Sequence, residues 1–205
     1  MSGAIPLTAD AFLARAAEAL ARSAAPGGDH VLNPDMTPDG RRLTEAAVLI
    51  PVVAREPEAT VLLTQRTADL RTHAGQIAFP GGKIEPDDLT PAAAALREAE
   101  EEVGLDPKLV KVVAELPPYL SRTGFRITPV LGRVAAEHVL TLNLSEVTEA
   151  FEVPLGFLLD PANHHKASRT FAGRERYFWE IPWRERYIWG VTAGIIRGLY
   201  EQVCR

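Results

Sequence analysis

The segment from Thr90 to Gly104 constrains the fold most, because it carries a helix start and a helix stop in one short stretch. Thr90 followed by Pro91 is typical of an N-cap and a first helical turn. Gly104 suits a left-handed C-terminal cap. We therefore expect a helix between these caps. Its last turns gather four glutamates within positions 98–102, at the end where the helix dipole opposes negative charge.

The phase of these glutamates on the helix is informative. At 100° per residue, Glu98, Glu101 and Glu102 fall within one third of the circumference. Glu100 points to the opposite side. Arg97 lies one turn before Glu101, where the two can pair. Two interpretations remain open: a solvated charged face, or a site whose divalent cation offsets the repulsion and also binds water and phosphate oxygens.

Apolar segments on both sides of this helix predict strands. We expect a hairpin of 46–56 and 59–67 and strands at 76–79, 110–116, 127–134, the second half of 145–155, and before a final helix within 184–200. Residues 8–22 predict an amphipathic helix with Thr8 as a plausible N-cap. The Pro/Gly-rich stretch 25–42 is interpreted as a linker or arm outside the core. Strands alternating with a few helices favour an α/β or α+β domain.

Composition excludes several classes of function. The net charge of −5, with no long basic tract, argues against non-specific nucleic-acid binding. The longest apolar run, Ala46 to Ala54, is too short to span a membrane. The N-terminus lacks the pattern of a secretory signal. Cys204 is the sole cysteine, which excludes an intrachain disulfide and fits a cytoplasmic location.

The loop before the helix completes a family pattern. Residues 79–83, "FPGGK", supply two glycines that permit close backbone approach. Together with the helix, the stretch from Gly82 to Leu105 resembles the signature of the Nudix hydrolases. That signature reads Gly, five residues, Glu, seven residues, Arg-Glu, an apolar residue, any residue, Glu-Glu, any residue, Gly and an apolar residue. It is matched in order by Arg97, Glu98, Ala99, Glu101, Glu102, Gly104 and Leu105.

The first acid of the signature departs from the pattern. Counting forward from Gly82 reaches Asp88, but eight residues rather than seven then precede Arg97. Counting back from Arg97 reaches Leu89, which cannot serve. We take Asp88 as the equivalent acid, with one extra residue in the loop.

A second motif points to a branch of the superfamily. Residues 62–82, "LLTQRTADLRTHAGQIAFPGG", resemble a motif of the coenzyme A pyrophosphatases, with Thr67 where Ser or Ala is more usual. The matching residues are Leu62, Leu63, Thr64, Arg66, Arg71, Gly75, Phe79, Pro80, Gly81 and Gly82. Coenzyme A carries a pyrophosphate and a separate 3′-phosphate, so it needs several positive contacts. The candidates are Arg66 and Arg71, together with His73 and Lys83. Without the motif, Arg66 would be interpreted as a surface residue at a strand end and Arg71 as paired with Asp69 or another acid.

The resemblance implies a fold and a set of site residues. The expected fold is an α/β/α sandwich with a mixed central sheet, formed by residues 43–205, with an N-terminal helix and arm in 1–42. The expected ligands of Mg²⁺ or Mn²⁺ are Glu98, Glu101 and Glu102. The expected catalytic set is Arg97, Glu98, Glu101 and Glu149. The general base stays open among Glu98, Glu146, Glu149 and Glu152. The expected substrate-binding residues are Arg66, Arg71, Gly81, Gly82 and Lys83.

The expected reaction is hydrolysis of coenzyme A, or of a derivative, to 3′,5′-ADP and 4′-phosphopantetheine. The alternatives are NADH, ADP-ribose or a damaged nucleoside triphosphate as substrate, or a non-catalytic nucleotide-binding module. The partner is then a small molecule rather than nucleic acid or membrane. His164 and His165 are interpreted as exposed loop residues. Aromatic residues of 177–189 are interpreted as core or homodimer interface rather than a platform for adenine.

Overall fold

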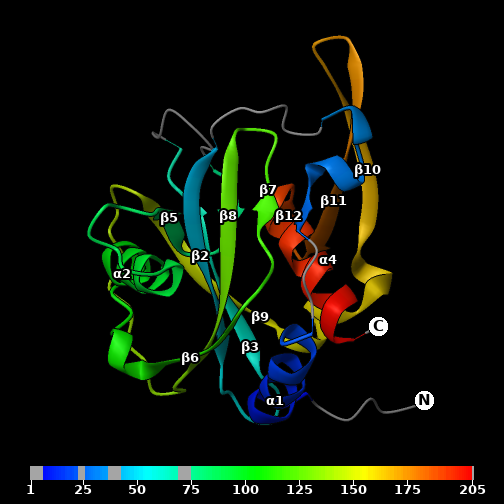
Figure 1. The fold of residues 1–205 in the computed structure, drawn as a ribbon. Helices are drawn as coiled ribbons and strands as arrows, with labels where there is room; N and C mark the ends of the chain where they lie inside the picture. Colours follow the sequence, from blue (N-terminus) through cyan, green and yellow to red (C-terminus); the bar gives the residue numbers. More distant parts are fainter. Residues whose placement is uncertain (1–6, 23–25, 37–42, 69–74, 205) are drawn as a thin grey trace, which may run out of the picture.

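Helices cover both faces of a mixed β-sheet (Figure 1). The structure is a computed structural model that describes residues 7–22, 26–36, 43–68 and 75–204. Its helices are α1 (Ala9–Leu20), α2 (Pro91–Val103), α3 (Leu155–Leu159) and α4 (Val191–Val203), with 3₁₀ turns at Asp29–Val31, Pro34–Met36, Pro107–Leu109 and Pro161–Asn163. Its strands are β1 (Gly27–Gly28), β2 (Thr44–Val53), β3 (Thr60–Arg66), β4 (Ile77–Ala78), β5 (Gly81–Lys83), β6 (Val110–Glu115), β7 (Tyr119–Leu120), β8 (Phe125–Val134), β9 (Val147–Pro154), β10 (His165–Phe171), β11 (Arg174–Trp183) and β12 (Arg186–Trp189). The expected sandwich with a mixed sheet is confirmed.

Strand β2 organises the sheet. It pairs in parallel with β8 along its whole length, from Thr44 opposite Phe125 to Val53 opposite Val134. Its other edge pairs antiparallel with β5 near its start and with β3 at its end. Strand β3 then pairs antiparallel with β4 and β9. The expected hairpin of β2 and β3 forms, and β5 fills the space where the two strands diverge.

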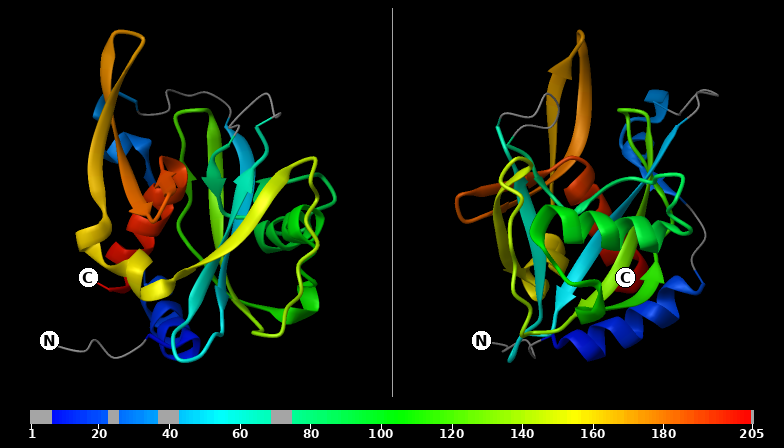
Figure 2. Two further views of the ribbon diagram at one scale, coloured as in Figure 1. Left: turned by 180° about the vertical axis from the view of Figure 1, so that it is seen from behind. Right: turned by 90° about the vertical axis from the view of Figure 1, so that its left-hand side faces the viewer.

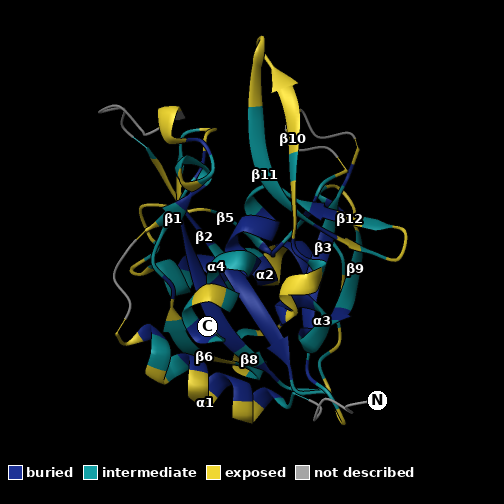
Figure 3. Cartoon of the chain, turned by 90° about the vertical axis from the view of Figure 1, so that its right-hand side faces the viewer, coloured by how far each residue is buried: buried dark blue, intermediate teal, exposed yellow. Residues whose placement is uncertain are grey.

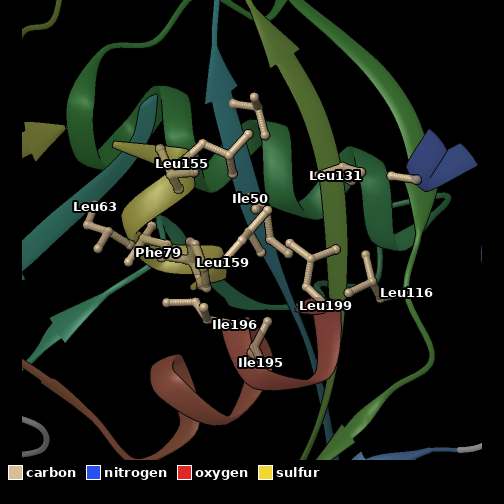
Figure 4. Close-up of a cluster of buried hydrophobic side chains, with 14 of the residues drawn as sticks. Ile50, Leu63, Phe79, Leu116, Leu131, Leu155, Leu159, Ile195, Ile196 and Leu199 are labelled. Atoms are coloured by element: carbon tan, nitrogen blue, oxygen red, sulfur yellow. The ribbon is translucent and has the colours of Figure 1, made fainter. Parts of the chain in front are cut away.

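Alternation along the strands divides the core into two halves, one on each face of the sheet. On one face, α2 packs its alanines and Val103 against residues such as Leu49 and Leu62. On the other face, Ile50 and Leu63, which follow Leu49 and Leu62 in the chain, pack toward α3 and α4 (Figure 4). Figure 2 shows α2 on one side of the sheet and α4 with α1 on the other.

The N-terminal helix belongs to the core. Phe12 and Ala16 of α1 are fully buried in the α4-side cluster, as the periodicity of 8–22 predicts. Thr8 occupies the N-cap position, but its side chain makes no capping hydrogen bond.

The stretch after α1 is not a free linker where the structure describes it. Gly27 and Gly28 pair in parallel with β7 as an additional strand of the sheet. The buried Asn33 side chain donates to the Tyr177 carbonyl and accepts from the Tyr177 N–H, both at 2.9 Å. Residues 26–36 are thus fastened to the sheet, although none of them belongs to the buried hydrophobic clusters. Backbone pairing and one buried amide, rather than apolar side chains, fasten this stretch, so a hydrophobic pattern does not reveal it.

A three-stranded sheet, β10–β11–β12, follows α3 (Figure 3). The strand expected before the final helix is confirmed as β12, whereas β10 and β11 were not predicted. Trp179 and Trp183 pack against the α4-side core, and a homodimer interface stays a prediction. No helix in the described ranges is long and apolar enough to span a membrane.

The prediction for His164 is wrong. This side chain is buried, with Nε2 at 2.7 Å from the Leu158 carbonyl oxygen, and it packs edge-on against Tyr200. His165 is exposed as expected, but it begins β10 rather than lying in a loop.

Candidate active site

The acidic helix is capped as its sequence predicts. The Thr90 hydroxyl accepts from the Ala93 N–H at 3.1 Å, and Gly104 ends α2 with a φ of 67°. Glu102 and Ala99 lie on the buried face, whereas Glu100 and Glu101 are exposed. Glu100 is thus solvated as expected, and Glu101 is exposed as well, although Arg97 binds it.

Glu102 is a buried carboxylate, only 2% exposed. Its Oε2 accepts from the Gly81 N–H and its Oε1 from Arg66 Nη1, each at 3.3 Å. Burial raises its pKa to about 7, although the Arg66 charge and the Gly81 N–H act in the opposite direction. Because burial destabilises the ionised form of Glu102, additional positive charge nearby would stabilise it.

Glu98 lies against the glycine loop. A Cβ built on Gly82 would lie 2.5 Å from the Glu98 carboxyl carbon, so a side chain at position 82 would displace this carboxylate. Partial burial raises the Glu98 pKa, while the neighbouring Arg97 lowers it. Gly81 is equally restricted, because its Cβ would lie 2.6 Å from Val48 Cα.

Arg97 joins the acids of the signature. Its guanidinium binds Asp88 in a bidentate manner, at 2.9 and 3.1 Å, and contacts Glu98 at 3.1 Å and Glu101 at 3.0 Å. The hydrogen bonds from Arg97 lower the Asp88 pKa. Leu89, the alternative by counting back, is 93% exposed. The structure therefore brings together Arg97 and Asp88, and Leu89, the extra residue of the loop, lies in solvent.

The expected substrate-binding residues are placed at one end of the sheet. Arg66 ends β3 beside Glu102, and Gly81 and Gly82 open β5. Lys83 is exposed, and its carbonyl accepts from Arg97. Arg71 and His73 lie outside the described residues.

The three later glutamates occupy different environments. Glu152 is bound by Arg55 and Thr60. Glu149 is bound by Arg186, which also stacks on Phe151 at 4.2 Å. Phe151 belongs to the α4-side core, whereas Ala150 packs on the α2 side, so alternation places Glu149 on the face opposite α2. The structure does not bring Glu149 or Glu152 to the acidic helix end.

Glu146 lies beside the acidic helix end. Thr141 N–H and Asn143 N–H donate to the carbonyls of Val103 and Glu102, at 2.8 and 2.9 Å, which satisfies the last turn of α2. The Asn143 side chain then donates to the Glu146 carboxylate at 3.3 Å. The Glu146 charge is close enough to raise the pKa of both Glu98 and Glu102, in addition to the larger effect of burial.

Comparison with known proteins identifies the family. A model of the NUDIX domain matches residues 43–172, more than half of the chain. The chain belongs to the Nudix family. It is 42% identical over 199 residues to an uncharacterized Nudix hydrolase NudL of Cronobacter sakazakii, covering 97% of this chain and 96% of that protein. The NudL protein of Escherichia coli (strain K12 / DH10B) is 43% identical over 174 residues, covering 84% of this chain and 90% of that protein.

A solved structure agrees with the fold. The MutT/nudix family protein from Enterococcus faecalis superposes with a TM-score of 0.52 at 16% identity, covering 93% of this chain and 74% of that one. At this identity the likeness shows the fold alone. Family membership shows more: the chain is a Nudix hydrolase, a class that acts on pyrophosphate bonds and generally uses divalent metal ions.

The carboxylates of α2 fit such a Nudix metal site by their chemistry, because Mg²⁺ and Mn²⁺ prefer oxygen ligands. Among the described residues, no three His, Cys, Asp or Glu side chains are already gathered as a ligand set. Glu98 and Glu101 are instead bound by Arg97, and Glu102 by Arg66. Neighbouring carboxylates repel one another. Here a guanidinium group, rather than a metal ion, provides the positive charge next to each of the three.

Proposed function

We propose that this Nudix hydrolase cleaves the pyrophosphate bond of coenzyme A, or of a derivative, to give 3′,5′-ADP and 4′-phosphopantetheine. The observation that carries the proposal is the position of Arg66. This arginine of the 62–82 motif contacts Glu102 of the Nudix helix at 3.3 Å, although 36 positions separate the two in the chain. The motif that resembles the coenzyme A pyrophosphatases thus borders the acidic helix.

The charges around this end suit a polyanionic substrate. We assign Glu98, Glu101 and Glu102 to Mg²⁺ or Mn²⁺, which would supply charge neutralisation for the pyrophosphate and a lower pKa for an attacking water. Arg66 presents a planar guanidinium suited to bidentate phosphate binding. Gly81 and Gly82 have no side chains, so the loop before α2 can lie close against Val48 and against the Glu98 carboxylate.

Two further residues complete the proposed site: Arg97 positions two of the glutamates, and Glu146 accepts the proton of the attacking water. Arg97 holds Glu98 and Glu101 in place by direct contacts. Glu146 is the candidate general base that the geometry favours, because its charge acts on both Glu98 and Glu102 and it is not bound by an arginine in the described part of the chain. Glu149, another candidate base from the sequence, is instead held by Arg186.

The test is incubation of the purified protein with coenzyme A and Mn²⁺ or Mg²⁺, followed by chromatographic separation of the products. We expect 3′,5′-ADP and 4′-phosphopantetheine, and neither with Glu101→Gln or in the presence of EDTA. A parallel panel contains NADH, ADP-ribose and oxidised nucleoside triphosphates. Turnover of a panel member without turnover of coenzyme A would move the assignment to that substrate. Metal binding without any turnover would favour a nucleotide-binding module.

A further inference from the structure

The contact between Arg66 and Glu102 is weak for a buried ion pair. One N–H of the guanidinium reaches one carboxylate oxygen at 3.3 Å, and the second oxygen accepts only at 3.3 Å from the Gly81 N–H. Strong charge-assisted hydrogen bonds are shorter and are often bidentate. Just after the end of β2, Arg55 binds Glu152 of β9 through two hydrogen bonds of 2.7 and 3.0 Å. Glu102 is therefore neutralised, but it is not tightly bound.

The backbone at Arg66 is fixed while its side chain reaches the surface. Its N–H donates to the Gln76 carbonyl at 3.0 Å, and its carbonyl accepts from the Gly75 N–H at 3.1 Å. The Arg66 side chain is 24% exposed, whereas that of Glu102 is 3% exposed. The guanidinium thus has open space into which it can rotate from a fixed strand end, whereas the Glu102 carboxylate is enclosed.

We propose that Arg66 is an exchangeable counter-ion. It neutralises Glu102 in the metal-free protein, and when a divalent cation takes this carboxylate, Arg66 is released to bind the phosphate groups of the substrate. The inference rests on the proposed function only in taking a pyrophosphate as the anion. It implies that cation and pyrophosphate bind cooperatively, because each favours the state in which the Arg66–Glu102 pair is broken.

The first test is Mn²⁺ binding to Arg66→Met by calorimetry, without any anion. The titration is made at pH 8.5, where protonation of Glu102 does not compete. Removing the guanidinium removes both a competitor for Glu102 and a like charge near the cation. We expect Mn²⁺ to bind roughly 5-fold or more tightly than to the wild-type protein. Arg66→Lys, which keeps the charge, should stay near wild type, and Arg66→Gln replaces the methionine variant if that variant does not fold.

The second test uses methylenebisphosphonate, a pyrophosphate analogue that is not hydrolysed. Its affinity is measured with and without saturating Mn²⁺, corrected for the complex that the two form in buffer. In the wild-type protein we expect Mn²⁺ to raise this affinity by roughly 5-fold or more. In Arg66→Met the enhancement should largely disappear.

Arg55→Met is the matched control, because it breaks another partly buried Arg–Glu pair of the same sheet. It should change Mn²⁺ affinity by less than about 2-fold, as expected for a site without shared partners. The proposal is overturned if folded Arg66→Met binds Mn²⁺ no more tightly than wild type, or if its enhancement by Mn²⁺ is unchanged. Neither titration involves turnover, so failure to hydrolyse coenzyme A leaves both results interpretable.

Discussion

Gly82 determines how closely the Glu98 carboxylate approaches the loop before α2. In Gly82→Ala the new Cβ would lie 2.5 Å from the Glu98 carboxyl carbon. Relief of this contact would move the carboxylate, and a misplacement of about 1 Å at a catalytic group can cost roughly 100-fold in rate. We therefore expect kcat of Gly82→Ala to fall by about that factor, measured with the substrate that the panel identifies.

Gly198 provides the control for this substitution. It lies within α4, and a Cβ there meets nothing within 4 Å. Gly198→Ala should keep full activity and raise the free energy of unfolding by about 0.5–1 kcal/mol, because alanine favours the helix. Full activity of Gly82→Ala would show that the position of Glu98 is not critical.

Glu146 and Glu149 give opposite expectations at the residue scale. Loss of a general base lowers kcat by roughly 10²- to 10⁴-fold, so Glu146→Gln should fall in this range. Glu149→Gln should lose far less, because Glu149 is bound by Arg186 on the face opposite α2. The pH–rate profiles and kcat values of both variants decide between them, and the reverse order would restore Glu149 as the base.

At the scale of single elements, α2 is the one that its own sequence specifies most completely. Its start uses the Thr90 hydroxyl and Pro91, and its end uses the positive φ of Gly104. The hydrogen bonds that satisfy its last carbonyls come from residues about 40 positions further along the chain, Thr141 and Asn143. This second contribution places Glu146, and no local pattern indicates it.

Helix α1 depends on its packing rather than on its caps. Phe12 is fully buried among residues of the α4-side core, and the N-cap Thr8 makes no side-chain bond. Phe12→Ala should lower the free energy of unfolding by about 3–5 kcal/mol, the usual cost of removing a buried phenyl ring. Denaturant titration measures this loss. The exposed neighbour Ala14 is a control site, where Ala14→Ser should change stability by less than about 0.5 kcal/mol.

At the scale of the whole molecule, Glu102 makes the metal-free protein sensitive to pH. The folded protein keeps the Glu102 proton up to about pH 7, whereas the unfolded chain releases it near 4.5. The folded state therefore binds more protons between these values, and its stability falls as pH rises through them. The two pKa values correspond to a contribution of at most about 3 kcal/mol.

Chemical denaturation in EDTA from pH 4.5 to 8 measures this dependence. In Glu102→Gln the decrease in stability should be much smaller, because the amide does not titrate, and metal-dependent turnover should be abolished. An identical pH dependence in the variant and the wild type would show that Glu102 does not carry it.

The sequence alone determined the parts of this protein that local chemistry decides. Helix α2 and the phase of Glu98, Glu101 and Glu102 follow from spacing along one short segment, because caps and helical periodicity act between near neighbours. The Nudix resemblance rests on the same residues. The pairing of Arg97 with Glu101 follows for the same reason.

Only the tertiary structure decided which distant residues contact helix α2 and its glutamates. It places Arg66 against Glu102, separates Glu146 from Glu149 and Glu152 although the three lie within seven positions, and buries His164. It also docks residues 26–36 and builds β10 and β11. These contacts depend on strand register, on which face alternation selects, and on backbone hydrogen bonds between segments far apart in the chain. No local pattern carries that information, because it arises only when the sheet is assembled.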